Sequence, residues 1–183
     1  MKLSMLSVVV ICMFMVGCTT TAPKYQASFE NIQKLKKAGS TQVNVGMFTP
    51  ESATVENLTI RGGAFVSPYN GSYVSYLREA LRQELYDADR FSDKSNTVVS
   101  GVLIKNEIDA SGINIGTAAV TARFVVKNGD KARYDKVKSA THKWESSFAG
   151  PIAVPRAQQN YMLVFQKLLS DLYDDHDFQT SLK

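Results

Sequence analysis

Residues 118–129 read AAVTARFVVKNG, and this stretch predicts a strand followed by a hairpin turn. Every second side chain from position 118 to 126 is apolar, which is the period of a strand with one buried face: Ala118, Val120, Ala122, Phe124 and Val126. The dipeptide Asn128-Gly129 follows, and it is a strong signal for a two-residue hairpin turn. We therefore expect this strand to pair antiparallel with the next run, roughly residues 131–148.

Three further runs complete the expected sheet. In the downstream run, an interruption at residues 136–138 suggests a bulge, and one face is expected to carry Ala140, His142, Trp144 and Phe148. The upstream run is expected to place on one face Val98, Val102, Ile104 and Ile108. A fourth strand is predicted at residues 43–47, where valine and methionine alternate with polar residues before Pro50.

Two long helices accompany these strands. Residues 72–88 have an apolar stripe at three- and four-residue spacing, formed by Val74, Leu77, Leu81, Leu85 and Ala88. A second stripe runs from Tyr161 to Leu172, in a helix whose first turn we expect at Pro155 and whose acidic end, residues 174–177, we expect to fray. A shorter helix is predicted between a Ser28 cap and Gly39.

The order of these elements is strand, helix, three strands, helix. Strands with one apolar face and helices with one apolar stripe pack as two layers. The expected fold class is therefore α+β, a two-layer sandwich with a mixed, mainly antiparallel sheet of about four strands and two main helices on one face.

The N-terminus has the pattern of an export signal. Lys2 precedes an uncharged apolar run from Leu6 to Val16, which ends at Gly17-Cys18. The segment is shorter than the roughly 20 residues needed to span a bilayer as a helix. Its last residues, Met15-Val16-Gly17-Cys18, resemble the lipobox of bacterial lipoproteins, although Leu and a smaller residue would be expected at positions 15 and 16. An ordinary signal peptide with a chance cysteine is the alternative.

The lipobox resemblance implies cleavage between Gly17 and Cys18 and lipidation of Cys18 by diacylglyceryl and acyl (palmitate-type) chains. Because Thr19 rather than Asp follows the cysteine, the resemblance also implies the periplasmic face of the outer membrane. The expected organisation is a signal peptide at residues 1–17, a lipidated polar tether at residues 18–27 and one periplasmic domain at residues 28–183. The element order resembles that of lipopolysaccharide-assembly lipoproteins, ABC-transport auxiliary lipoproteins and YajG-like outer-membrane lipoproteins.

Composition narrows the functional classes. The 183-residue chain has a formal net charge of +4, too small an excess to indicate a nucleic-acid partner. Its two histidines, His142 and His176, stand far apart, and the sequence contains no nucleophile elbow, phosphate-binding loop or zinc-binding helix motif. We therefore predict no catalytic residues, no metal and no cofactor. The function predicted is that of a non-enzymatic, lipid-anchored envelope protein that binds a partner in outer-membrane assembly, transport or maintenance.

Two surfaces are candidates for binding. Residues 49–71 form a long, glycine-rich and aromatic connection, and connections of this length often bind ligands or partners. With a turn that has two unplaced isoleucines, it supplies the candidate partner surface Arg61, Phe65, Tyr69, Ile113 and Ile115, although Phe65 and Tyr69 would alternatively serve only packing. A basic hairpin supplies a candidate patch for anionic envelope lipid at Lys131, Arg133, Lys136 and Lys138. The alternatives to partner binding are a lipid carrier that uses this patch and a hydrolase of cell-wall or lipid substrates.

Overall fold

The computed structural model describes residues 19–183, and its main sheet is the one predicted from residues 118–129. Its strands are β2 (Asn44–Pro50), β5 (Thr97–Asp109), β6 (Ile115–Asn128) and β7 (Lys131–Glu145), in the order β2-β5-β6-β7. β5, β6 and β7 are antiparallel, whereas β2 lies parallel to β5. The alternating apolar residues of β6 are all buried, as its period predicted.

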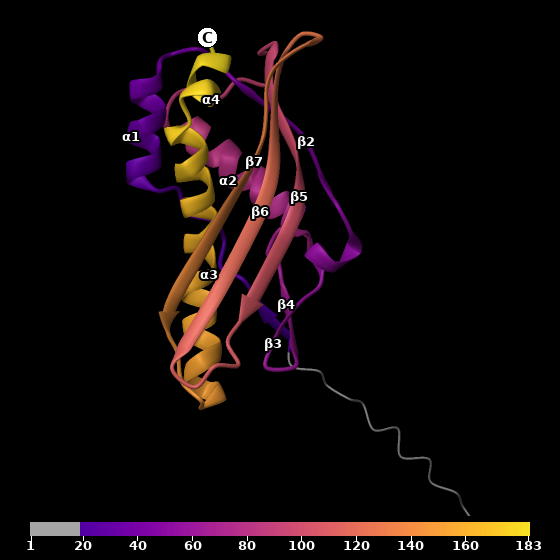
Figure 1. Cartoon of the computed structure of the whole chain (residues 1–183), viewed down its shortest axis with the longest axis vertical. Coiled ribbons are helices and arrows are strands. Elements are labelled where there is room, and N and C mark those ends of the chain that lie inside the picture. The colour runs from indigo at the N-terminus through magenta and orange to yellow at the C-terminus, as the bar shows by residue number, and fades with distance from the viewer. Residues whose placement is uncertain (1–18) are drawn as a thin grey trace, which may run out of the picture.

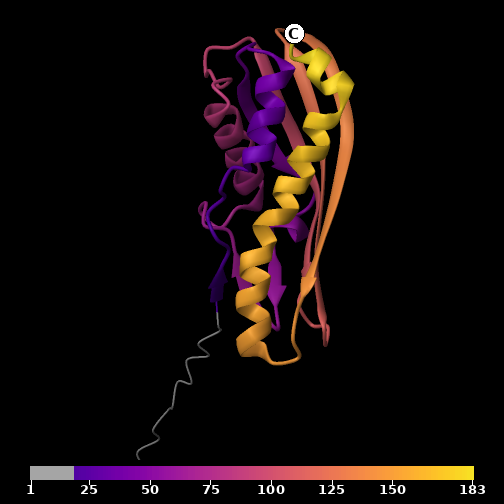
Figure 2. The same ribbon diagram turned by 90° about the vertical axis from the view of Figure 1, so that its left-hand side faces the viewer.

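The helices lie on one face of this sheet (Figures 1 and 2). Helix α2 (Tyr73–Asp87) packs against β2 and β5, and α3 (Gly150–Asp174) packs against β6 and β7. Helix α1 (Phe29–Ala38) contacts α2 and α3, and the short α4 (His176–Ser181) follows α3. The α+β fold class, with a mixed four-stranded sheet and its main helices on one face, is confirmed.

A second, smaller sheet was not predicted. It consists of β1 (Thr19–Thr21), β4 (Gly63–Val66) and β3 (Leu58–Ile60), in that order. A short 3-10 helix, η1 (Ala53–Glu56), precedes β3 in the chain. Within residues 49–71, strands β3 and β4 form a tight hairpin, so this connection is not an open loop. Its turn residues, Arg61 and Gly62, both have positive φ (53° and 80°), which is typical of a two-residue hairpin turn. An arginine at the first position hides this signal in the sequence.

Residues 19–27 also differ from the polar tether expected. Strand β1 pairs parallel with β4, Thr19 opposite Ala64 and Thr21 opposite Val66. Beyond it, Ala22 and Tyr25 are buried in the hydrophobic core. This segment is therefore part of the folded domain.

The predicted inner face of β5 was wrong by one residue over the first half of the strand. In β5 the buried positions include Val99 and Leu103, whereas Val98, Val102 and Ile104 of the predicted face are not buried. Ile108, beyond the register shift, packs against the core as predicted. The register with β6 shifts between Leu103 and Lys105, so one extra residue stands in β5 and Asn106 becomes buried. A bulge of this kind reverses which side chains point inward, and alternation alone does not reveal it.

The C-terminal part shows related differences. The irregularity expected at residues 136–138 of β7 lies instead at Arg133, between the residues paired with Lys127 and Val126. Phe148 lies beyond β7 and is exposed rather than on its inner face. Helix α3 begins at Gly150, so Pro155 lies inside it. The acidic end does not simply fray, because the Asp175 side chain accepts a hydrogen bond from the Asp177 N–H and caps α4.

Candidate functional site

Of the two aromatic residues of the predicted partner surface, Phe65 lies in the core and Tyr69 packs against it. Phe65 is 1% exposed, and its carbonyl accepts a hydrogen bond from the Tyr73 hydroxyl. The Tyr69 ring packs edge-on against Tyr76 with 5.5 Å between centroids, and its hydroxyl accepts a hydrogen bond from the Tyr25 N–H. The assignment of Phe65 and Tyr69 to an exposed surface is therefore wrong, and the packing alternative describes both residues.

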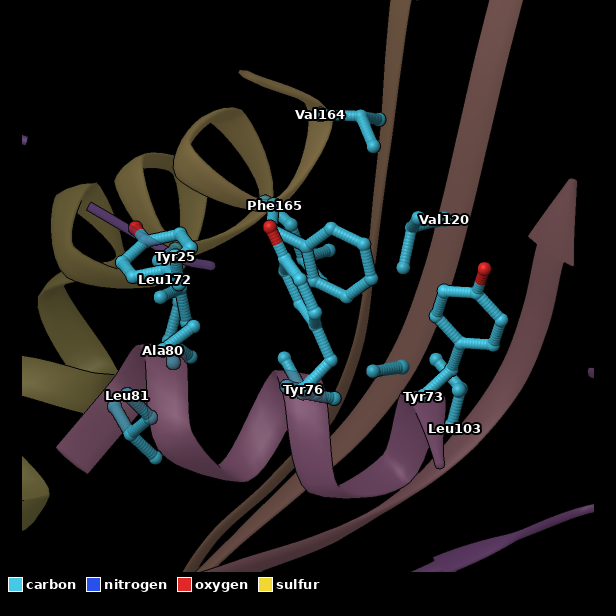
Figure 3. Packing of buried hydrophobic residues seen from close by; sticks show 14 of the residues in the cluster. Tyr25, Tyr73, Tyr76, Ala80, Leu81, Leu103, Val120, Val164, Phe165 and Leu172 are labelled. Atoms are coloured by element: carbon cyan, nitrogen blue, oxygen red, sulfur yellow. The ribbon is translucent and has the colours of Figure 1, made fainter. Parts of the chain in front are cut away.

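These residues belong to an aromatic cluster between α2, α3 and the sheet. Tyr76 lies at its centre and points from α2 towards Phe165 of α3, with 4.8 Å between ring centroids (Figure 3). Tyr161 contacts the same rings, and its hydroxyl donates to Asn106 Oδ1 at 2.6 Å. Burial raises the pKa of Tyr161 far above its ordinary value. Side chains thus fill the space between the two layers.

One carboxylate, Glu84 of α2, is fully buried beside this cluster. It accepts hydrogen bonds from the Tyr25 hydroxyl at 2.5 Å, the Ser28 N–H at 3.1 Å and the Asn31 amide at 3.0 Å. Burial raises the pKa of Glu84, and these hydrogen bonds oppose that rise. All three donors lie on the N-terminal segment or on α1, so Glu84 ties that part of the chain to α2. The sequence offered no sign of this site, because Glu84 stands among ordinary helix residues.

The other members of the predicted partner surface remain exposed and lie together. The Arg61 guanidinium donates to the carbonyl of Ser147 at 2.9 Å and, more weakly, to that of Gly112 at 3.5 Å. It also lies over the exposed ring of Phe148, 5.9 Å from its centroid. Ile113 and Ile115 follow Gly112 and are 69% and 51% exposed. The structure therefore replaces Phe65 and Tyr69 in this surface with Phe148.

Two of the four residues of the basic patch, Lys136 and Lys138, are paired with the acidic C-terminal residues. Lys136 contacts Asp175 at 3.2 Å and Asp177 at 2.6 Å, and Lys138 contacts Asp171 at 3.4 Å and Asp175 at 2.9 Å. Partial burial alone would raise the pKa of Asp175, but hydrogen bonds from Lys138, the backbone N–H of Asp177 and Lys136 outweigh it and hold that pKa well below its usual value. The basic hairpin and the acidic tail thus form one ion-pair cluster. An open groove of about 560 Å³ beside it is lined by side chains that include Lys131, Arg133 and Lys136.

The remaining candidates for acid–base chemistry also have structural contacts. His142 Nε2 lies 3.0 Å from the Asn160 side-chain oxygen, and its ring stacks beside the buried Trp144. Among residues 19–183, no three or more His, Cys, Asp or Glu side chains are grouped so that they would hold a metal ion. None of the helices described in that range has the length and apolar character needed to cross a bilayer. The predicted signal peptide, the cleavage site at Gly17 and the lipidation site at Cys18 lie outside the described residues.

Comparison with known proteins places the fold alone. No family model and no curated protein matches this sequence. The fold is similar to that of protein XCC0632 from Xanthomonas campestris, a DUF330 protein, with a TM-score of 0.53 and 11% identity over 88% of this chain and 92% of that one.

Two further solved structures are more distant. The hypothetical protein CT253 from Chlamydia trachomatis has a TM-score of 0.44 and 11% identity, over 73% of this chain and 93% of that one. A protein from Caulobacter crescentus, described as a candidate lipoprotein, has a TM-score of 0.47 and 9% identity, over 82% and 93%.

Proposed function

We propose that this protein is a non-enzymatic envelope lipoprotein, anchored through Cys18 at the periplasmic face of the outer membrane. In this proposal the folded domain binds another envelope component that acts in outer-membrane assembly, transport or maintenance. The signal peptide is removed between Gly17 and Cys18, and the cysteine thiol carries the lipid.

The observation that carries the proposal is the position of Cys18 in the chain. It ends an apolar export signal, and the next residue, Thr19, is already paired with Ala64 in the small sheet. The expected cleavage site therefore lies one residue from the folded domain. An acyl anchor at Cys18 would hold this domain directly against the membrane, since neighbouring Cα atoms are only about 3.8 Å apart.

The side chains support binding rather than catalysis. Glu84 is saturated by donors from its own chain, and the aspartates of the C-terminal end are paired with lysines. By contrast, two exposed surfaces remain open to contact with a partner or with the membrane. One is the cluster around Arg61 and the two isoleucines, and the other is the face of the main sheet opposite the helices, where Arg123 pairs with Asp135 across two strands (Figure 2).

Labelling with radioactive palmitate tests the anchor. The wild-type chain should incorporate label and fractionate with the outer membrane, whereas Cys18→Ser should stay unlabelled and uncleaved. Mature-sized, membrane-bound protein in the Cys18→Ser variant would contradict the proposal. The lipidated protein should also co-purify with one envelope component. The substitution Arg123→Glu tests whether the open face of the sheet makes that contact.

A second candidate function is that of a carrier for anionic envelope lipid, and the groove beside Lys131 and Arg133 favours it. The pairing of Lys136 and Lys138 with aspartates reduces the positive charge available there. Binding of acidic phospholipid vesicles that weakens with salt and with Arg133→Glu would support the carrier, because attraction at an exposed surface is screened over about 10 Å at 0.1 M salt.

A further inference from the structure

The exposed apolar side chains of this domain are unevenly distributed. Among residues 19–183, eight large hydrophobic side chains are strongly exposed. Four of them lie in the β5–β6 and β7–α3 connections or in the first residues of the element that follows: Ile113, Ile115, Phe148 and Ile152. Single exposed apolar residues are common on protein surfaces, but a group of them marks a contact with protein or membrane. We call these four residues the apolar tip.

Hydrogen bonds hold the tip in a defined shape. The Ser146 N–H donates to the Asn114 carbonyl at 2.8 Å and joins the two connections. Arg61, from the β3–β4 turn, donates to the carbonyl of Ser147 and covers the ring of Phe148. Three turns that are distant in sequence therefore meet, and two of them present their apolar side chains together. Fixed geometry lowers the entropy lost when such side chains become buried.

The N-terminus of the described chain lies at the same end of the molecule. Thr19 pairs with Ala64, three residues after Arg61, so two strand spacings and about two residues of strand separate Thr19 from the β3–β4 turn, on the order of 10 Å. Figures 1 and 2 show β1 and the turns of the tip at one end of the long axis, whereas the C-terminus and the β6–β7 hairpin lie at the other. The residue that would carry the anchor is therefore within a short distance of the apolar tip.

From this juxtaposition we infer that the apolar tip contacts the lipid leaflet in which Cys18 is anchored. This inference rests on the proposed lipid anchor at Cys18. Acyl chains at Cys18 bring the tip to the depth of the lipid headgroups, where isoleucine and phenylalanine side chains are favourably buried. The charged residues around the apolar tip are of both signs: Arg61, Arg156, Asp109 and Glu145. The contact of the tip with lipid therefore depends on apolar burial and not on net charge.

The inference fixes the orientation of the domain. The long axis of the main sheet stands away from the membrane, and the β6–β7 hairpin with its ion-pair cluster points into the periplasm. The open face of the sheet is then the surface that a partner reaches. The surface around Arg61, Ile113 and Ile115 is occupied by lipid.

An environment-sensitive fluorophore on Phe148→Cys tests the inference. In the mature chain Cys18 would be acylated, so the introduced thiol is the only free one. The labelled, lipidated full-length product is placed in vesicles of phosphatidylethanolamine and phosphatidylglycerol. Val137→Cys is the matched control, because Val137 is 54% exposed in the middle of β7 and away from the tip.

We expect the label at position 148 to shift to shorter wavelength and to be quenched several-fold more by nitroxide lipids than the label at 137. This difference should persist at high salt. Equal, water-like emission at both positions in vesicle-bound protein would overturn the inference. A shift seen only in native envelopes would also overturn it and would indicate a protein partner. A shift seen only at high protein-to-lipid ratio would overturn it as well and would indicate contact with a second copy of the chain. Protein that fails to associate with vesicles and lacks acyl chains would instead contradict the anchor itself.

Discussion

Tyr25→Phe removes one hydroxyl group and leaves an aromatic ring of the same shape. The hydroxyl donates to the buried Glu84 carboxylate at 2.5 Å, and the ring packs edge-on against Tyr76. A hydrogen bond to a charged group contributes about 1.5–3 kcal/mol. Because Glu84 keeps its donors from Ser28 and Asn31, we expect a loss near the lower part of this range, about 2 kcal/mol. In a domain of this size, such a loss lowers Tm by about 4–8 °C.

The loss should depend on pH. Burial raises the pKa of Glu84 above its ordinary value of 4.5, so folding favours the protonated form. The stability this group contributes is therefore full below the unfolded pKa and is lost as pH rises through the folded pKa. Removal of the Tyr25 hydroxyl raises the folded pKa further, because that hydrogen bond stabilises the ionised carboxylate. The cost of Tyr25→Phe should thus be larger at about pH 8 than at about pH 5.

Urea denaturation at the two pH values measures these differences. Tyr86→Phe is the matched control, because Tyr86 lies on the same helix as Glu84 but has an exposed side chain. It should change stability by less than about 0.5 kcal/mol. In a Glu84→Gln background, the cost of Tyr25→Phe should become independent of pH. A loss equal to that of Tyr86→Phe, or one that does not change with pH in the wild-type background, would refute the reasoning.

Three further predictions concern packing and charge. Leu81→Ala should lower the free energy of unfolding by about 2–5 kcal/mol, because Leu81 is fully buried on α2. Arg82→Ala loses an ion pair and a contact with an aromatic face and should lower it by about 1 kcal/mol or less, and equal losses would mean that the helix faces are misassigned. Lys138→Glu should lower the unfolding free energy by about 1–3 kcal/mol, because it breaks a partly buried pair with Asp175 and places two like charges together. A smaller loss at high salt would confirm this repulsion, and no loss would contradict the pairing. Gly116→Val should destabilise by about 1–3 kcal/mol, because a side chain there overlaps the buried indole of β7; an unchanged Tm would show that the indole has room to move.

The aromatic and buried polar contacts are where sequence reasoning failed, and the reason is physical. Phe65 and Tyr69 stand in a connection rich in glycine, and nothing local distinguishes an aromatic residue that covers a surface from one that enters the core. The outcome depends on the room left between α2 and α3, which is a property of the packed layers. The same holds for Glu84, because its three donors lie more than fifty residues away in the sequence.

Hydrophobic period and turn chemistry are local properties, so the main sheet, its hairpin at Asn128-Gly129 and the helices that cover it could be predicted from the sequence. The helix cap at Ser28 could be predicted in the same way, and its side-chain oxygen accepts a backbone N–H three residues on. Three features could not be predicted and are seen only in the folded chain: the bulge in β5, the small sheet that includes β1, and the gathering of three turns around Arg61. These features arise from pairings between distant segments, and their energy depends on which backbone groups and side chains meet once the layers have packed.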